Sequence, residues 1–306
     1  MSEMRLKRYP GNPVLVPTSN WWETRCVFNA SAAAWNGRVH LLYRAIGDDN
    51  VSRFGYASSG DGFEFDIRSE LPVYEPALDN QWERLGCEDP RIARIGDTFY
   101  VVYTGASLYS AEHGPTFGFG PPWRCRVSLI STKDFREFQH HGVILPDHDD
   151  KDAVLFPEKI GGRYAMLHRI LPDICLSYSD HLIHWGDTRK VIGPRPGFWD
   201  SDRIGAGGTP IKTERGWLNF YHGVDGGRVY RLGVLTLDLD DPTEAVFRSD
   251  EPCLGPEERY EKEGPVPNVV FSCGAVEKDG QYLVYYGGAD RVIAVASIGV
   301  DEVLRL

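Results

Sequence analysis

Five segments of the chain share one short pattern of apolar and polar positions. In each, a turn residue precedes an alternating run of aromatic and aliphatic residues, with a tyrosine or histidine six positions on. Alternation of this kind predicts a β-strand. The segments are GRVHLLYRA (Gly37 to Ala45), DTFYVVYTG (Asp97 to Gly105), GRYAMLHRI (Gly162 to Ile170), GWLNFYHGV (Gly216 to Val224) and GQYLVYYGG (Gly280 to Gly288).

The spacing of the copies is regular and predicts a repeated structural unit. A short segment that ends in a turn precedes each copy and another strand follows it, so each unit reads as four strands joined by hairpins. No stretch keeps the apolar face of a long helix. The sixth-position residues are Tyr43, Tyr103, His168, His222 and Tyr286, separated by 60, 65, 54 and 64 residues.

Five four-stranded units predict an all-β fold, a five-bladed β-propeller around a central channel, with residues 1–306 as a single domain. We expect the N-terminal arm and the C-terminal strand to share one blade and so close the ring. The competing interpretation is a pair of β-sandwiches whose strands resemble one another by chance.

Composition narrows the class of partner. The 306 residues are 42% hydrophobic and 12% aromatic, which is enough apolar material for a core and fits a sugar binder. The formal net charge of -11 argues against nucleic acid and anionic membranes as partners. The six cysteines show neither zinc spacing nor a disulfide framework, which predicts a reduced, cytoplasmic protein. We see no secretory signal and no apolar run long enough to span a membrane.

Polar residues near the starts of the innermost strands are the candidates for chemistry, because these strands face the channel of a propeller. Arginine and histidine facing inward favour an anion or a polyol as the ligand. The structural alternative is an ion pair between Arg44 or Arg91 and Glu88 or Asp89 that only holds a blade in place. The candidate positions are Asn29 and Ser31, Glu88 to Arg91, Asp152, Gly205 to Lys212 and Asn268 to Cys273, with Arg44 and Arg169 on the strands that follow.

Stretches from Gly11 to Ala296 also match a known family. They are VFNASAA with LLYRA, CEDPRI, DAVLFPEKIGGRYAMLHR, GGTPIKTERGWLNFYHGV, YRLGVLTLDLDDP, EGPVPNVVFSCGAV and VYYGGAD. Together they resemble glycoside hydrolase family 130, the inverting β-mannoside phosphorylases, β-1,4- or β-1,2-linked, and related β-mannosidases. The resemblance implies a five-bladed propeller, which agrees with the repeat count.

The resemblance implies roles for individual residues. The general acid falls on Asp89 of the E-D-x-R motif, and Glu88 stands beside it in the substrate site. Asn29, Arg44 and Asp290 match positions that hold the mannosyl unit. The phosphate-binding residues that it implies are Arg169, Lys212, His222, Tyr230, Arg126 and Lys151.

One acid surrounded by cations fits phosphorolysis. An inverting hydrolase needs a second carboxylate to activate water, whereas phosphate is already a nucleophile and needs cations that hold it in line. We therefore expect a reversible reaction that converts a β-mannoside or manno-oligosaccharide and phosphate into α-mannose 1-phosphate and a shortened sugar. Inorganic phosphate is the co-substrate, and we expect no metal and no organic cofactor, because the histidines lack ligand spacing.

Other functions stay open. A non-catalytic propeller would bind carbohydrate on aromatic platforms such as Trp21 or Trp123. An arabinanase or fructosidase relative would need three separated carboxylates at the blade starts, where only Asp89 and Asp152 are acidic. An inverting β-mannosidase of the same family would use water, with a base from among Asp200, Asp202, Glu258, Glu261 and Glu263.

The acceptor side of the site is the least defined by sequence. The loop from Ser107 to Pro122 follows the strand after Asp89 and is rich in glycine, proline and aromatic residues. We expect it to form an acceptor-side wall or lid, or else a contact between subunits of a homo-oligomer. The linkage and the acceptor sugar are not predicted.

Overall fold

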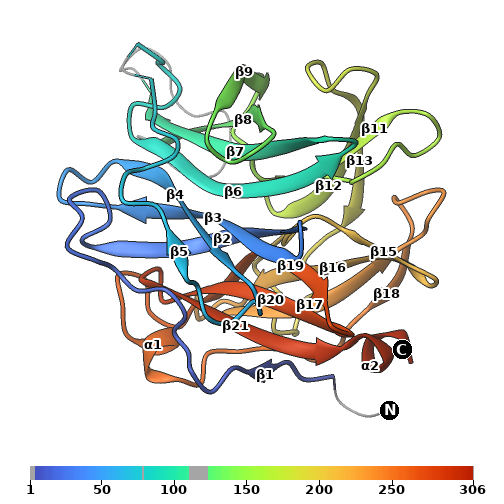
Figure 1. Ribbon diagram of the computed structural model, residues 1–306. Coiled ribbons are helices and arrows are strands. Elements are labelled where there is room, and N and C mark those ends of the chain that lie inside the picture. Colours follow the sequence, from blue (N-terminus) through green and yellow to red (C-terminus); the bar gives the residue numbers. More distant parts are fainter. Residues whose placement is uncertain (1–3, 78, 110–122, 306) are drawn as a thin grey trace.

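The computed structural model describes residues 4–77, 79–109 and 123–305, and this part of the chain is all-β (Figure 1). Antiparallel hairpins follow one another along the sequence. Two short helices, α1 (Arg259–Lys262) and α2 (Val300–Leu304), are the helical segments of the described ranges, and neither is long enough to cross a membrane. The expected fold class is therefore confirmed at the level of secondary structure.

The largest sheet holds the first half of the chain. Its order is β2 (Cys26–Trp35), β3 (Arg38–Ile46), β4 (Ser52–Ser59), β6 (Gly86–Ile95), β7 (Thr98–Leu108), β8 (Trp123–Thr132) and β9 (Phe138–Leu145), with β5 (Ile67–Arg68) beside β4. A single parallel pair, Ser52 with Gly86, joins β4 to β6. This sheet therefore consists of two antiparallel groups, β2–β5 and β6–β9, that touch at one edge.

Three further antiparallel groups complete the described chain. The third group is β10 (Lys151–Leu155), β11 (Tyr164–Ile170), β12 (Asp173–Ser179) and β13 (Gly186–Ile192). In the fourth, β14 (Arg203–Gly205) and β15 (Ile211–Thr213) both pair with β16 (Gly216–Val224), and β17 (Tyr230–Leu237) and β18 (Ala245–Arg248) follow. The fifth is β19 (Val270–Lys278), β20 (Gln281–Gly288) and β21 (Val292–Gly299), extended by β1 (Lys7–Arg8).

The N-terminal arm joins the C-terminal strand, as the sequence predicts. Lys7 pairs with Ser297 and Arg8 with Ala296, so β1 is the outer strand of the fifth group. Figure 1 shows the two chain ends on the same side of the molecule. The first and last strands are thus held together by backbone hydrogen bonds.

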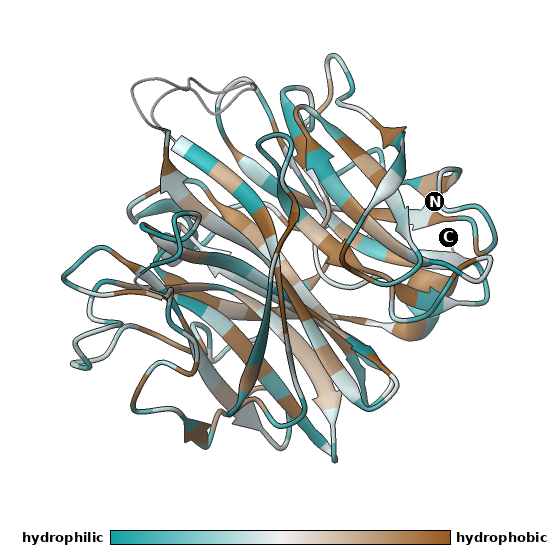
Figure 2. Cartoon of the chain, turned by 90° about the horizontal axis from the view of Figure 1, so that it is seen from above, coloured by the Kyte–Doolittle hydropathy of each residue, from teal (hydrophilic) through white to brown (hydrophobic). Residues whose placement is uncertain are grey.

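The apolar core is divided among clusters that each lie between two consecutive groups. On β3, Leu42 packs toward the second group while its neighbour Leu41 packs toward the fifth. Both faces of the middle strands are therefore buried, although apolar and polar positions alternate elsewhere along the strands (Figure 2). The clusters contain Leu42 with Tyr103, Val102 with Met166, Leu167 with Tyr221, Leu218 with Val284, and Tyr285 with Leu41.

A buried carboxylate pairs with a tyrosine or histidine in every group, and we call these five pairs the carboxylate clasps. Tyr43 donates to Glu23 at 2.9 Å, and Tyr286 donates to Glu261 at 2.8 Å. All five carboxylates are fully buried, so each needs such a partner. The clasps are Tyr43–Glu23, Tyr103–Glu83, His168–Asp150, Tyr221–Asp200 and Tyr286–Glu261.

The fourth clasp corrects the sequence pattern, which placed His222 in the tyrosine and histidine series. Tyr221 lies opposite Gly233, just as Tyr43 lies opposite Gly55 in the first group. Neighbouring side chains on a strand point to opposite faces. The shift by one residue therefore turns His222 away from the clasp position.

Glu261 provides a test of what a clasp contributes to stability. Its carboxylate accepts from Arg8 Nε at 2.8 Å and Nη2 at 2.9 Å, from Tyr286, and from the backbone N–H groups of Glu257 and Glu258. We expect Glu261→Gln to lower the free energy of unfolding by about 3 kcal/mol, because a neutral amide removes the buried anion that faces Arg8 and leaves that charge with only the exposed Glu257 as its ionic partner among the described residues. Urea unfolding measures this loss.

The matched control is Glu263→Gln at the end of α1. In the part of the chain that the structure describes, the ionic partner of Glu263 is the exposed Arg259, so the substitution should change the unfolding free energy by less than about 0.5 kcal/mol. Equal unfolding midpoints for the two variants would contradict the role assigned to the clasp.

Candidate active site

Three innermost strands are each interrupted by one residue with a left-handed backbone. Asn29, Asp89 and Asp152 have φ of 50°, 53° and 55°, and the pairing of β2, β6 and β10 with their neighbours shifts register at these points. Asparagine and aspartate tolerate this conformation better than other residues with a side chain. Such a bulge redirects a side chain out of the strand pattern. All three side chains line the same pocket.

This pocket has a volume of about 350 Å³ and mixes charged residues with an apolar wall. All five strand groups contribute residues to it, and none of these residues lies on the outermost strand of a group. Its lining residues are Asn29, Arg44, Asp89, Lys151, Asp152, Arg169, Leu171, Arg203, Arg228, Tyr230, Val266, Val269, Phe271 and Asp290.

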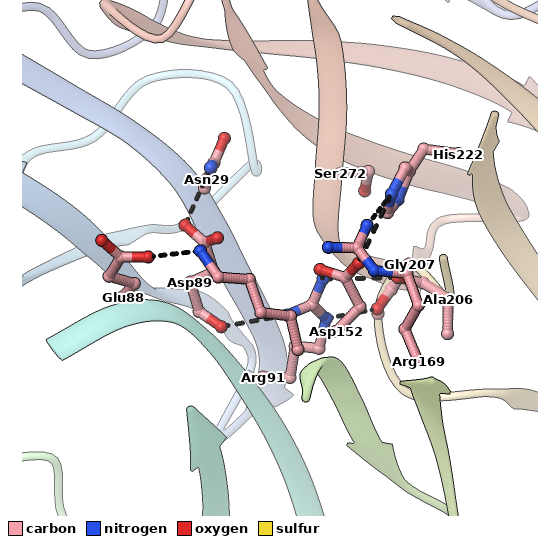
Figure 3. Close-up of polar contacts among 12 residues, drawn as sticks. Asn29, Glu88, Asp89, Arg91, Asp152, Arg169, Ala206, Gly207, His222 and Ser272 are labelled. Carbon is pink, nitrogen blue, oxygen red and sulfur yellow. Dashed lines mark hydrogen bonds and ion pairs between the residues drawn. The ribbon is translucent and has the colours of Figure 1, made fainter. Parts of the chain in front are cut away.

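Asp89 lies on one side of the pocket and is held by two donors. Asn29 Nδ2 donates to Asp89 Oδ1 at 2.8 Å (Figure 3). Arg44 Nη1 donates to the same oxygen at 3.3 Å. Gly287 leaves the room for this contact, because a Cβ there would lie 2.4 Å from Asn29 Oδ1. The carboxyl of Asp89 is therefore fixed in position while it still faces the pocket.

Glu88 does not line the pocket itself but holds two of its cations in place. Its carboxylate accepts from Arg44 Nη2 at 2.7 Å and from Lys151 Nζ at 2.8 Å. Burial alone would raise the pKa of Glu88, but Arg44 and Lys151 together lower it to about 2. Glu88 is thus an anion that orients two cations of the pocket, rather than a proton donor.

Asp290 is the carboxyl of the pocket that is most ready to carry a proton. Burial raises its pKa to about 7; Arg44 opposes the shift, and the neighbouring Asp89 and Glu88 add to it. Among the described residues, no hydrogen bond from another side chain reaches the Asp290 carboxyl. It lies beside Asp89, in reach of a ligand.

An ion cluster around Asp152 forms the other side of the pocket. Arg91 Nη2 donates to Asp152 Oδ1 at 2.9 Å, and Arg169 Nη1 lies 2.7 Å from Oδ2 (Figure 3). Burial opposes ionisation of Asp152, but Arg169 and Arg91 keep its pKa below the usual range. Gly205 allows this packing, because a Cβ there would lie 2.4 Å from Asp152 Oδ2. Asp152 is a fixed anion between two arginines.

His222 completes this cluster as a neutral group. Its Nε2 lies 3.5 Å from both Asp152 Oδ2 and Arg169 Nη1, and its ring packs on Phe271 with centroids 4.4 Å apart. Burial lowers the pKa of His222 to about 3; Asp152 opposes the shift, and Arg169 and Arg91 add to it. His222 can offer a hydrogen bond to a ligand but not a positive charge.

The chain as a whole matches a known family over nearly its full length. A family model described as beta-1,4-mannooligosaccharide phosphorylase, of glycoside hydrolase family 130, matches residues 3–306. The chain belongs to glycoside hydrolase family 130. The family predicted from the sequence motifs is confirmed.

Named members of family 130 match over nearly their whole length. The chain is 44% identical to a 1,2-beta-oligomannan phosphorylase of Thermoanaerobacter sp. (strain X514), covering 98% of this chain and 99% of that protein. It is 41% identical to a beta-1,2-mannobiose phosphorylase of the same organism, covering 98% and 99%. The solved beta-1,2-mannobiose phosphorylase from Listeria innocua, in complex with beta-1,2-mannobiose, superposes with a TM-score of 0.85 at 32% identity, covering 99% of each chain.

Most of the residues that the sequence predicts for the family 130 site come together in the pocket. Glu88 and His222 lie directly behind it, in contact with lining residues. Tyr230 presents its hydroxyl at the rim, where it accepts from Arg203 Nη2 at 2.7 Å. The predicted residues that line the pocket are Asn29, Arg44, Asp89, Lys151, Arg169, Tyr230 and Asp290.

Lys212, which the family resemblance assigns to the phosphate cluster, does not lie among the lining residues. In the pairing of β15 with β16, Lys212 lies opposite Trp217, near the start of β16. His222 lies five residues beyond Trp217 on the same strand, which is roughly 17 Å from Trp217. The Lys212 ammonium is half-exposed and forms a surface ion pair with Glu158. The GGTPIKT motif is near the site, but its lysine points to a different surface.

Arg126 is also placed outside the lining of the pocket. Its guanidinium binds Asp149 at 2.7 Å and the carbonyl oxygens of Pro146 and Cys125. These contacts hold the start of β8 against the segment before β10. The loop predicted to form an acceptor wall, Ser107 to Pro122, falls outside the described residues from position 110 onward.

The sequence analysis missed two polar residues of the pocket lining, Arg203 and Arg228. It named Asp152 and Arg91 as candidate positions, but not as an ion pair. The DGGR turn before Tyr230 was the available signal, because a turn that ends next to a candidate residue presents its side chains to the same place. Within the described ranges, no group of three or more metal-ligating side chains occurs.

The raised pKa of Asp290 predicts a pH-dependent stability difference. The folded protein holds this proton more tightly than the unfolded chain, whose ordinary pKa is 3.8, so ionisation costs stability as pH rises from about 4 to about 7. Asp290→Asn removes that cost. Because Asp290 is partly exposed, we expect the variant to gain about 1–2 kcal/mol relative to wild type between pH 5 and pH 8.

Urea unfolding at the two pH values, in phosphate-free buffer, measures this gain. Asp279→Asn serves as the control, because that carboxylate is almost fully exposed and the variant should track wild type at both pH values. A pH-independent difference between Asp290→Asn and wild type would contradict a raised pKa.

Proposed function

We propose that the protein catalyses the reversible, inverting phosphorolysis of β-mannosides, with inorganic phosphate as co-substrate. The products are α-mannose 1-phosphate and a sugar shortened by one unit. The observation that carries the proposal is the division of the pocket, with Asp89 held by donors on one side and Arg169 with its neighbours on the other. Such a site can protonate a leaving group while it holds an anionic nucleophile.

Asp89 acts as the general acid in this scheme. Asn29 and Arg44 fix its carboxyl and line the same side of the pocket, where they also bind the mannosyl unit, with Asp290 as a further sugar contact. The proton passes from Asp89 through the mannosyl 3-hydroxyl to the glycosidic oxygen, as the family resemblance implies. The bond from the anomeric carbon to that oxygen then breaks.

Phosphate attacks the anomeric carbon from the opposite face. Arg169 and Lys151 supply charge, Tyr230 supplies a hydrogen bond, and the neutral His222 supports the phosphate side from behind the pocket through its contact with Arg169. Their contribution is to hold one phosphate oxygen in line with the bond that breaks and to offset its repulsion by the carboxylates. No organic cofactor or metal enters this scheme.

The placement of carboxylates favours phosphate over water as the nucleophile. Asp152, the lining carboxylate on the far side, is committed to Arg91 and Arg169, so it is poorly placed to act as a base. The other candidate bases lie outside the set of described lining residues, and two of them, Asp200 and Glu261, are clasp carboxylates. The full set of these candidates is Asp200, Asp202, Glu258, Glu261 and Glu263.

We further propose that the substrate carries β-1,2 linkages. The family description names a β-1,4 activity, but the relatives at 44% and 41% identity and the solved neighbour from Listeria innocua are all named for β-1,2-linked mannosides. We also infer that the five strand groups close into a five-bladed propeller and form one domain of residues 1–306. The apolar clusters between consecutive groups and the β1–β21 pairing support this inference.

The first test of the proposal is the demand for phosphate. Purified protein should cleave β-1,2-mannobiose, to α-mannose 1-phosphate and mannose, only when inorganic phosphate is present, because Asp152, the carboxylate on the far side of the pocket, is committed to two arginines and is poorly placed to activate water. Ion chromatography of the products measures both sugars. If mannobiose is converted to two molecules of mannose at the same rate without phosphate, the protein is a hydrolase. If the sugar binds but is not cleaved, the protein is a carbohydrate-binding protein.

The second test concerns the acid. Asp89→Asn should lower kcat by about 10³-fold, because it removes the group that protonates the leaving oxygen while it keeps the shape of the side chain. Asp97→Asn, in the exposed turn between β6 and β7, is the matched control and should keep wild-type turnover. The assignment fails if Asp89→Asn, folded by circular dichroism, turns over at a near-normal rate.

A further inference from the structure

The charges that line the pocket are almost completely paired. Arg44 contacts Glu88 and Asp89, Lys151 contacts Glu88, and Arg169 contacts Asp152. Arg203 Nη1 contacts Asp202 at 2.9 Å. These ion pairs hold the pocket together, but they also leave each of these cations facing a carboxylate before any ligand arrives.

Arg228 is the exception among the basic lining residues. Its side chain is exposed at the mouth of the pocket, and among the residues that the structure describes no carboxylate lies within 4 Å of its guanidinium. The other four basic lining residues, Arg44, Lys151, Arg169 and Arg203, each face a carboxylate. Arg228 therefore adds a positive charge at the mouth that no carboxylate of the described residues offsets.

The chain builds a rigid support for Arg228. The turn between β16 and β17 is held by Asp225, whose Oδ1 accepts from Gly227 N at 2.9 Å and Val229 N at 3.1 Å, and whose Oδ2 accepts from Arg231 at 2.7 Å. Arg228 itself has a left-handed backbone with φ of 61°, which is costly for an arginine. The three hydrogen bonds of Asp225 hold the turn in this costly conformation, and the turn places the Arg228 side chain in the pocket lining.

We propose that Arg228 is the outer phosphate-binding residue, which captures inorganic phosphate at the mouth and holds it beside Arg203 and Tyr230 on its way to Arg169. The inference rests on the proposed function. A protein of net charge -11 repels a phosphate dianion, so a local cation at the entrance raises the rate of encounter. An arginine that no carboxylate of the described ranges engages keeps its donors available for the ligand.

Arg228→Gln tests the proposal in two ways. The KM for phosphate should rise about tenfold while the KM for β-1,2-mannobiose and kcat stay within about twofold, and the fall of kcat/KM for phosphate with added salt should become shallower. Calorimetric titration with inorganic phosphate alone should show a similar loss of affinity. Arg228→Lys, which keeps the charge, should recover part of both effects.

The matched control is Arg215→Gln, which removes one exposed arginine from the β15–β16 turn, away from the lining residues. It should leave the phosphate KM and its salt dependence at wild-type values. An unchanged phosphate KM in Arg228→Gln overturns the proposal, and so does an effect confined to the sugar, which would place Arg228 in the acceptor subsite. If wild type binds phosphate through Arg228 but turns over without it, the proposed function fails and this inference stands.

Discussion

The structure depends on one fully buried guanidinium, that of Arg91. Its Nε donates to the carbonyl of Gly207, and its terminal nitrogens reach the carbonyls of Asp89 and Ala206 and the carboxylate of Asp152. One side chain of the second strand group thereby fixes the third and the fourth. A buried charge is tolerable only when its donors are satisfied in this way. The same contacts set where the acid and the cation side of the pocket lie relative to each other.

The sequence pattern predicts the parts of this arrangement that repeat. Alternation and spacing identify the middle strands, and the polar residues at the starts of the innermost strands locate Asn29 and Asp89. The pattern also predicts Arg44 and Arg169, because they come one position after the clasp residues Tyr43 and His168. The pattern is off by one only in the fourth copy, where tyrosine and histidine are adjacent and both can bind a carboxylate. Tyr221 takes the clasp position because it lies opposite Gly233 on β17, and Gly233 lies outside the repeated segment.

Other features could not be read from the chain because they depend on contacts between distant segments. Lys212 belongs to a motif that borders the site, yet the strand carries its side chain to the surface, and a motif does not show direction. The positive charge expected of His222 is removed by burial, which no neighbouring residue in the sequence reveals. The pairing of Asp152 with Arg91 joins positions 61 residues apart. Chemistry of this kind emerges only when the groups are assembled.

The pairing of β1 with β21 bears on how the chain reaches this state. Lys7 and Ser297 are 290 residues apart in the sequence, so their strands can pair only when the folding of the intervening chain has brought them together. Closing so long a loop costs entropy that local hairpins do not incur, and contacts of this range form late. The N-terminal arm is therefore a latch, and β21 gains its outer partner in one of the last steps of folding.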